Sequence, residues 1–324
     1  MREKRNFGSF FLIDQGFLKK QRLYSRKKIL IGLSMRCCLP IILSYLLPIF
    51  TVCSSQAKIP ITVETDTYHF AQKIIADQKI LSIKDFSGPN SHRDVVEFIL
   101  VQQALALGGS KIDFTFTLGN YDARNIRLLQ SGLLLISFDS LWLSQIINFN
   151  ESVYISDAVI RKGEYWAGLY TSADNSKALA TERLADLSKL SIISNKNWYV
   201  DWKTVTQLAP KALIHEEEWI SMAKLVSLQW VDVMLVPFNQ SQPFTYQNDG
   251  YNIIAINGIK VALNDSRHFV VSKKHPKGKE TFIALQKGLK ILRERGSIIK
   301  AFQQSGFFND QVQEWTVINS ASSQ

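Results

Sequence analysis

The chain has 324 residues, with 38 Lys and Arg against 28 Asp and Glu, which gives a formal net charge of +10. Residues 1–57 hold ten of the basic and two of the acidic side chains, so the remainder carries 28 basic and 26 acidic groups and is almost neutral. This balance excludes a basic field over the whole protein, and we expect no nucleic acid partner. With 46% hydrophobic and 20% charged residues, the composition excludes a disordered chain and a coiled coil.

All the cysteines lie near the N-terminus, at Cys37, Cys38 and Cys53. The rest of the chain therefore has no disulfide, no thiolate metal site and no cysteine nucleophile. Only His, Asp and Glu remain as metal ligands there. The five histidines are scattered without a metal-binding spacing, and we expect no metal and no cofactor.

Residues 39–52 (LPIILSYLLPIFTV) are almost entirely apolar and lie between the charges of Arg36 and Lys58. The run has the length of the hydrophobic part of a secretory signal and is shorter than the roughly 20 apolar residues of a membrane-spanning helix. Ser55 and Ala57 provide small side chains at the two positions that signal peptidase reads. We therefore predict export to the periplasm, with the signal peptide cleaved near Ala57.

Three alternatives stay open for this region. An inner-membrane anchor would join residues 29–33 to the apolar run, but Arg36 would then lie inside the span at a cost on the order of a few kcal/mol. Cys53 could carry a lipid, although residues 50–52 lack the leucine expected before such a cysteine. Translation could also start at Met35, because the basic stretch before it is longer than that of an ordinary signal.

After the signal, strand-like and helix-like segments alternate, as in an α/β protein with mixed, mostly parallel sheets. Residues 59–78 predict a strand and a helix, without a place in the sheet. Ser91 can cap a helix that ends at the glycines 108–109 and keeps its apolar residues at helical spacing. Beside this helix, the first unit is predicted to contain a strand at 79–84, a strand at 112–118, a helix at 122–130 and a strand at 133–138.

A second unit repeats this arrangement after residue 185. It is predicted to contain a strand at 190–194, a helix at 201–208, a strand at 212–215, a helix at 219–229 and a strand at 231–236. Residues 164–171 (EYWAGLYT) read as an extended segment leaving the first unit, and residues 259–272 hold another that returns. Two crossover strands of this kind form a hinge between two lobes. A closing helix at 279–304 places its apolar residues on one face: Phe282, Leu285, Leu289, Leu292, Ile299 and Phe302.

Three segments and their order carry a resemblance to a known family. They are residues 128–136 (LLQSGLLLI), 183–187 (RLADL) and 302–308 (FQQSGFF). Together with the export signal and the order of elements, they resemble the type II periplasmic solute-binding proteins, especially the amino-acid-binding cluster of ABC-transporter receptors. The resemblance covers most of residues 79–308.

The resemblance implies a two-lobed α/β fold, with 58–166 and 265–324 in lobe 1 and 167–264 in lobe 2. It also implies a monomer that is not an enzyme, that binds a small polar solute by hinge closure, and that delivers the solute to an ABC permease or a membrane sensor. Members that bind amino acids usually carry an arginine after the third strand and an acid after the last strand of lobe 2. Residues 139–145 (DSLWLSQ) and 237–240 (PFNQ) lack both, although Arg124, Arg127 or Arg161 could replace the arginine.

Ligands of open α/β sheets bind outside the carboxyl ends of the strands, where helix N-termini present free N–H groups. Aromatic side chains there stack on the ligand and small polar ones orient it. For each aromatic residue, core packing is the competing interpretation. Trp142 and Trp198 are the preferred individual candidates. The rule selects Phe86, Ser87, Tyr121, Ser140 and Trp142 in lobe 1, and Asn195, Trp198, Trp219 and Asn239 in lobe 2.

Other chemistries find no support in the sequence. There is no phosphate-binding glycine loop and no G-x-S-x-G nucleophile turn. Two further functions remain open beside solute binding. One is an exported enzyme on the same two-lobed fold, since a fold does not determine a function. The other is a soluble partner of a chemoreceptor or a histidine kinase.

Overall fold

A computed structural model of the protein describes residues 58–88, 90–119 and 122–320. Residues 55–324 form one compact unit. The apolar run at 39–52, Cys53 and the cleavage site at Ala57 lie outside the described residues, so the signal and its alternatives stay predictions. Within the described ranges, no helix combines the length and the hydropathy that crossing a bilayer requires.

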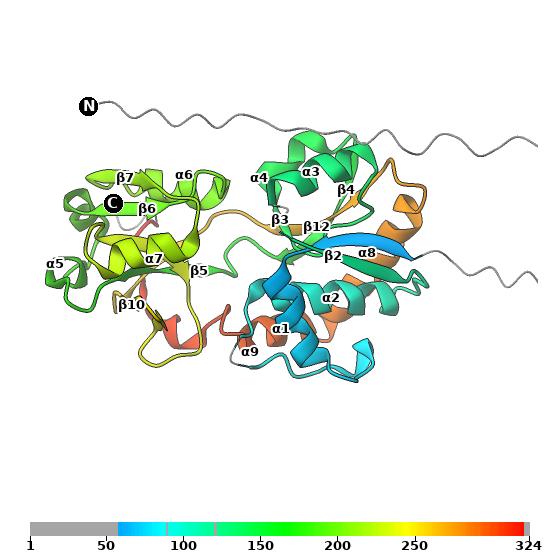
Figure 1. The fold of residues 1–324 in the computed structure, drawn as a ribbon, viewed down its shortest axis with the longest axis horizontal. Coiled ribbons are helices and arrows are strands. Elements are labelled where there is room, and N and C mark those ends of the chain that lie inside the picture. Colours follow the sequence, from blue (N-terminus) through cyan, green and yellow to red (C-terminus); the bar gives the residue numbers. More distant parts are fainter. Residues whose placement is uncertain (1–57, 89, 120–121, 321–324) are drawn as a thin grey trace, which may run out of the picture. The chain divides into compact units, whose positions relative to one another are not determined.

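Lobe 1 is the part of Figure 1 that holds α1, α2, α3 and α8. In the described ranges it has a two-stranded parallel sheet, β1–β2, and a three-stranded antiparallel sheet in the order β3-β12-β4. Its strands are β1 (Ile59–Val63), β2 (Phe114–Leu118), β3 (Leu141–Trp142), β4 (Val153–Ile160) and β12 (Arg267–Ser272). Its helices are α1 (Thr65–Ile75), α2 (Arg93–Leu107), α3 (Asp122–Ser131), α4 (Leu143–Ile146), α8 (Gly278–Glu294) and α9 (Ser297–Gln304), with 3₁₀ turns at Ile80–Ser82 and Ile147–Phe149.

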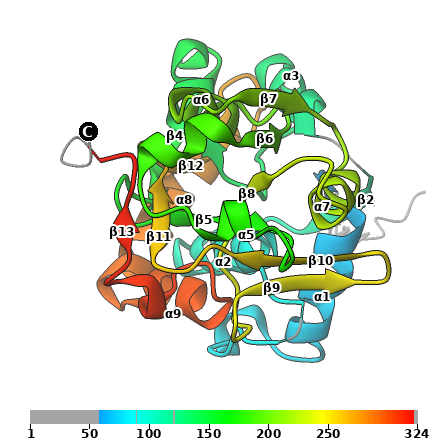
Figure 2. The same ribbon diagram turned by 90° about the vertical axis from the view of Figure 1, so that its left-hand side faces the viewer.

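Lobe 2 is built, among the described residues, on one eight-stranded mixed sheet. The strand order is β13-β11-β5-β8-β6-β7, and β10 and β9 extend it from β5 (Figure 2). Its strands are β5 (Trp166–Thr171), β6 (Ser191–Ser194), β7 (Ala212–His215), β8 (Val233–Pro237), β9 (Thr245–Asn248), β10 (Tyr251–Ala255), β11 (Ile259–Ala262) and β13 (Thr316–Val317). Its helices are α5 (Ser176–Leu179), α6 (Tyr199–Gln207) and α7 (Trp219–Ser227), with 3₁₀ turns at Leu184–Lys189 and Asp310–Val312.

Three stretches of the described chain connect the two lobes. Residues 161–165 lead from β4 to β5, and residues 263–266 lead from β11 to β12. The crossovers predicted from the sequence, at 164–171 and within 259–272, overlap these two connections, although residues 166–171 form β5 in the lobe 2 sheet. The third connection follows α9 and ends in β13, which pairs with β11 in the sheet of lobe 2. The end of the chain, expected in lobe 1 with the rest of 265–324, thus adds a strand to lobe 2.

Two strands predicted in lobe 1, at 79–84 and 133–138, are not strands in the structure. Within residues 79–84, Ile80–Ser82 form a 3₁₀ turn and no strand is present, and the first strand is β1, which pairs in parallel with β2. Residues 134–138 are buried beside β12, but they form bends and one isolated bridge, between Ile136 and Val271, instead of a strand. Backbone hydrogen bonds from Ser137 to Val270 and from Ser272 to Leu135 hold this segment in place.

The predicted closing helix is two helices, because Gly296 adopts a left-handed conformation with φ of 70° between α8 and α9. The predicted apolar face nevertheless packs into the core, where Leu285, Leu289, Leu292 and Phe302 are all buried. Helix α8 packs closely on α2. A Cβ atom at Gly288 would lie 1.7 Å from the carbonyl oxygen of Ala104, so only glycine permits this approach.

Candidate pocket with residues from both lobes

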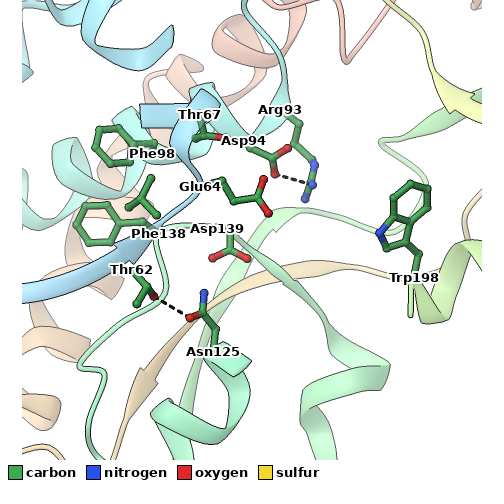
Figure 3. Close-up of a pocket in the computed structure, with 11 residues that line it drawn as sticks. Thr62, Glu64, Thr67, Arg93, Asp94, Phe98, Asn125, Phe138, Asp139 and Trp198 are labelled. Carbon is green, nitrogen blue, oxygen red and sulfur yellow. Dashed lines mark hydrogen bonds and ion pairs between the residues drawn. The ribbon is translucent and has the colours of Figure 1, made fainter. Parts of the chain in front are cut away.

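A cavity of about 210 Å³ opens at the carboxyl end of β1, where residues of lobe 1 and lobe 2 line it together (Figure 3). Lobe 1 provides the N-termini of α1 and α2, part of α3 and the loop before β3, and lobe 2 provides the residue before α6. The lining residues are Thr62, Val63, Glu64, Thr67, Arg93, Asp94, Phe98, Asn125, Phe138, Asp139 and Trp198.

The β1 strand determines which side chains reach the cavity from its end. Alternation along the strand buries Ile61 and Val63 and turns Thr62 the other way. The Thr62 hydroxyl donates to Oδ1 of Asn125 at 2.7 Å, which joins the strand to α3. Glu64 is the residue immediately before α1 and follows directly after the strand. The carboxyl end of this strand therefore delivers polar groups to the cavity wall.

Arg93 and Asp94 form an ion pair at the N-terminus of α2, with Arg93 Nη2 at 2.6 Å from Asp94 Oδ1. Burial raises the pKa of Asp94, but Arg93 and His92 outweigh it and hold that pKa well below its usual range. Burial also lowers the pKa of Arg93, yet the Asp94, Glu97 and Asp139 charges raise it above its ordinary value. Both groups are thus charged at physiological pH.

A buried network of polar groups lies behind this ion pair. The Ser140 amide donates to Oε2 of Glu97 at 2.8 Å, and the Ser140 hydroxyl donates to Oε1 at 2.5 Å. Glu97 is fully buried and lies 3.7 Å from Arg93 Nη1. Arg267 of β12 donates from Nε to Ser140 Oγ at 2.9 Å and from Nη2 to the Ser140 carbonyl at 2.5 Å. This network holds Glu97 and Arg267 in place beneath the cavity.

Lobe 2 reaches the cavity through Trp198, the residue before α6. Asn195 builds the turn that positions it. The Asn195 carbonyl accepts from the Trp198 amide, its Oδ1 accepts from the Asn197 amide at 2.8 Å, and its Nδ2 donates to the Glu217 carbonyl at 3.0 Å. Further along α6, burial raises the pKa of Asp201, while Arg267 and Arg93 of lobe 1 oppose that shift. Electrostatic interactions therefore connect the two lobes near the cavity.

Comparison with known proteins gives structural matches only. No family model and no curated protein sequence matches the chain. The probable amino-acid ABC transporter extracellular-binding protein ytmK from Bacillus subtilis superposes with a TM-score of 0.52 at 13% identity, covering 78% of this chain and 100% of that one. A mutant of ArgBP from T. maritima gives a TM-score of 0.50 at 12% identity, covering 78% and 96%.

The chain has the two-lobed fold of the type II periplasmic binding proteins. At these identities the likeness establishes the fold alone. A third match, the ancestral amino-acid-binding protein AncCDT-1, described as a precursor of cyclohexadienyl dehydratase, has a TM-score of 0.49 at 17% identity and covers 78% and 96% of the two chains.

Some of the site residues predicted from the sequence lie at or near the cavity, and the others lie elsewhere in the fold. Trp198 lines the cavity. Ser140 and Trp142 are not among the lining residues; both contact Arg267, and Ser140 follows the lining residue Asp139. Asn195 supports the turn that presents Trp198. Tyr121 lies outside the described residues.

The other predicted residues do not line this cavity. Phe86 is buried, and its amide donates to Oε1 of Gln304 at 3.1 Å. Ser87 is exposed and donates to Asp85. Trp219 packs edge-on against Tyr246, with ring centroids 5.4 Å apart. Asn239 donates from Nδ2 to the carbonyl of Thr245 at 2.7 Å.

Most of the lobe 1 residues that line the cavity were not predicted from the sequence. Glu64 and Thr67 follow β1, and the rule for the carboxyl ends of strands would have selected them had the strand predicted within 59–78 been given a place in the sheet. Asp139 is the residue immediately before the predicted Ser140. The guanidinium at the cavity belongs to Arg93, at the start of α2, whereas Arg124, Arg127 and Arg161 are not among the lining residues. Over the described parts of the chain, no group of three His, Cys, Asp or Glu residues is arranged to hold a metal ion.

Proposed function

We propose that this protein is an exported solute-binding protein that closes its two lobes on a small polar solute and delivers it to an ABC permease or a membrane sensor. The observation that carries this proposal is the cavity, because Trp198 of lobe 2 and Glu64, Arg93 and Asp139 of lobe 1 line one space. The matched ytmK is described as the extracellular-binding protein of a probable amino-acid ABC transporter, which supports the same role.

Ligand-driven closure follows from this arrangement. A solute that touches residues of both lobes stabilises the closed arrangement by its differential affinity for it. Trp198 offers a flat apolar surface, and the opposite wall offers charged groups and an amide. Such a mixture of one aromatic face and a few oriented polar groups is typical of small-molecule sites. We expect the protein to act as a monomer without a cofactor.

A thermal-unfolding screen tests the proposal. The full chain, unfolded and refolded to remove co-purified ligand, is heated with amino acids, amines, oligosaccharides and nucleobases in turn. A ligand at about 100 times its Kd stabilises the folded state by about 2.7 kcal/mol, so a true ligand raises the unfolding temperature by several degrees. If no compound shifts the unfolding of the refolded protein, the binding proposal fails.

A second candidate, an exported enzyme, has one observation in its favour. Glu64, Asp94 and Asp139 bring three ionisable carboxyl groups into the same cavity, and active sites collect such groups. However, the lowered pKa of Asp94 makes it a weak base, which suits an electrostatic role better than proton transfer. NMR spectra of each stabilising compound after prolonged incubation separate the two candidates. A binding protein returns the compound unchanged, and an enzyme converts it.

The proposal also includes export of the protein to the periplasm. Cleavage near Ala57 predicts that the protein recovered from the periplasm begins at about residue 58. N-terminal sequencing of that protein checks it, and a mature start before residue 50 would reject the proposed boundary. Retention of residues 1–57 in the membrane fraction would instead favour the anchor.

A further inference from the structure

Negative charge dominates the cavity wall. Among the described residues that line it, Glu64, Asp94 and Asp139 are acidic and Arg93 is the basic one. Figure 3 shows the carboxyl groups of Glu64 and Asp139 pointing toward the same space, with the ion pair of Arg93 and Asp94 beside them. Like charges collected in a partly enclosed space raise the local concentration of counter-charges. The wall therefore favours a ligand that carries positive charge.

Arg93 is poorly suited to bind the carboxylate of a ligand. Its Nη2 lies 2.6 Å from Asp94, and its Nη1 is buried, 3.7 Å from Glu97, without a hydrogen-bond partner. The Asp139 charge acts on the same guanidinium. A ligand carboxylate would compete with these acids and would also meet Glu64 and Asp139. Like charges at such short distances destabilise a complex.

The uncharged part of the cavity wall is polar at Thr62, Thr67 and Asn125, and apolar or aromatic at Val63, Phe98, Phe138 and Trp198. Phe98 and Phe138 are buried and pack on each other, with ring centroids 5.5 Å apart. Trp198 faces the cavity from lobe 2. Aromatic faces attract cations and also cover hydrocarbon chains. The volume of about 210 Å³ is below the roughly 300–1,000 Å³ of pockets for drug-sized ligands, so the occupant is small.

We propose that this cavity recognises a small organic amine that carries no carboxylate, with its ammonium group near Glu64 and Asp139 and its hydrocarbon part against Phe98, Phe138 and Trp198. The inference rests on the proposed binding function and narrows its ligand. It differs from recognition of an α-amino acid, which needs a cationic group free to hold the α-carboxylate.

Matched pairs of ligands that differ by one carboxylate test this inference directly. Isothermal titration of the refolded full chain compares cadaverine with L-lysine and agmatine with L-arginine. In each pair the amine lacks the α-carboxylate of the amino acid and is otherwise the same molecule. We expect the amine to bind at least about tenfold more tightly. Equal or tighter binding of the amino acid would overturn the inference while leaving the binding function intact.

Three further outcomes separate the possible failures. If neither amines, amino acids nor the neutral compounds of the thermal screen bind, the proposed function fails together with the inference. If calcium or magnesium chloride binds and displaces the amine at micromolar concentration, the carboxylates serve a metal ion and the inference is wrong. Neutral sugars that bind more tightly than every amine would also contradict it.

Charge-removing variants locate the ammonium group. Glu64→Gln and Asp139→Asn keep the shape of each side chain and remove its charge, and each is expected to weaken amine binding by about tenfold. Glu151→Gln is the matched control, since Glu151 is exposed and is not among the lining residues. Circular dichroism and thermal unfolding verify that each variant folds. If both folded variants bind the amine as tightly as the unmodified chain, the assignment is wrong.

Discussion

The guanidinium carbon of Arg267 lies 4.5 Å from the centre of the Trp142 ring. A cation over an indole face is attracted by the ring quadrupole, and burial strengthens the attraction. The same guanidinium donates to the hydroxyl and the carbonyl of Ser140. Trp142 and Ser140 therefore contact a buried arginine of the protein itself, and neither is among the residues that line the cavity.

Replacing Arg267 with methionine is expected to destabilise the protein. Arg267→Met keeps an apolar stem near Trp142 but leaves the buried charge of Glu97 with less compensation, at a cost of about 3 kcal/mol. Urea denaturation monitored by circular dichroism measures the change in free energy of unfolding. The control is Arg295→Met, which removes an exposed arginine and should change that free energy by no more than about 0.5 kcal/mol. Equal changes in the two variants would show that the contacts of Arg267 with Ser140 and Trp142 contribute little to the free energy of unfolding.

Trp198 is expected to determine affinity without determining stability. Trp198→Ala removes the aromatic surface that lobe 2 contributes, and we expect about a tenfold rise in Kd for the tightest ligand of the screen. The unfolding temperature of the ligand-free protein should stay nearly constant because Trp198 is only half-buried. Trp230→Ala serves as the control, since Trp230 is 74% exposed and lies elsewhere on lobe 2. A loss of affinity as large in Trp230→Ala would contradict the assignment.

The contact between α2 and α8 is expected to tolerate no added methyl group. A Cβ atom at residue 288 would overlap the Ala104 carbonyl, so Gly288→Ala must push the helices apart. We expect it to lower the free energy of unfolding by about 2 kcal/mol or more, although alanine favours helices in general. Lys287→Ala, at an exposed position of the same helix, should change it little. Chemical denaturation of both variants checks the prediction, which fails if Gly288→Ala unfolds at the same urea concentration as the unmodified chain.

His268 is expected to make the protein less stable at acid pH. Burial lowers the pKa of His268, although the Ser156 carbonyl, Asp265 and Asp157 oppose the shift. The unfolded chain takes up the proton near pH 6.5 while the folded protein does not. Stability from this residue is therefore present above pH 6.5 and is lost as the pH falls through that value, with a slope of up to about 1.4 kcal/mol per pH unit.

The measurement compares the free energy of unfolding at pH 8 and pH 5.5 in the unmodified chain and in His268→Gln. The variant should lose less stability between the two pH values because it has no imidazole to protonate. His69→Gln, at an exposed position, keeps His268 and should retain the full loss. An unchanged pH dependence in His268→Gln would remove His268 as its cause.

Lobe 2 follows the sequence predictions more closely than lobe 1. Strands β6, β7 and β8 are short apolar runs separated by amphipathic helices, so local periodicity determines them. Residues 79–84 (KILSIK) were predicted to form a short strand, but Ile80–Ser82 form a 3₁₀ turn in which Leu81 is exposed, and Ile83 is buried after it. The pairing partner of β1 lies more than 50 residues away in sequence, and local patterns contain no information about it.

The candidate site was also only partly predictable from local sequence patterns. The rule that ligands bind at the carboxyl ends of strands selected Trp198, which lines the candidate cavity, because β6 was predicted correctly. In lobe 1 the rule was applied to residues 79–84, which form no strand, and it selected Phe86 and Ser87 instead of Glu64. The charges of Arg93 and Asp94 belong to the first turn of a helix whose position became clear only with the fold.

The third connection between the lobes has a mechanical consequence. Lys260 of β11 donates to the carbonyls of Val312 and Gln313 and lies 4.1 Å from the Trp166 ring centre, which fastens the chain end to lobe 2. Residues 305–315 run from α9 of lobe 1 to β13 of lobe 2. A movement of one lobe against the other would therefore have to displace or bend this stretch as well as the two crossovers.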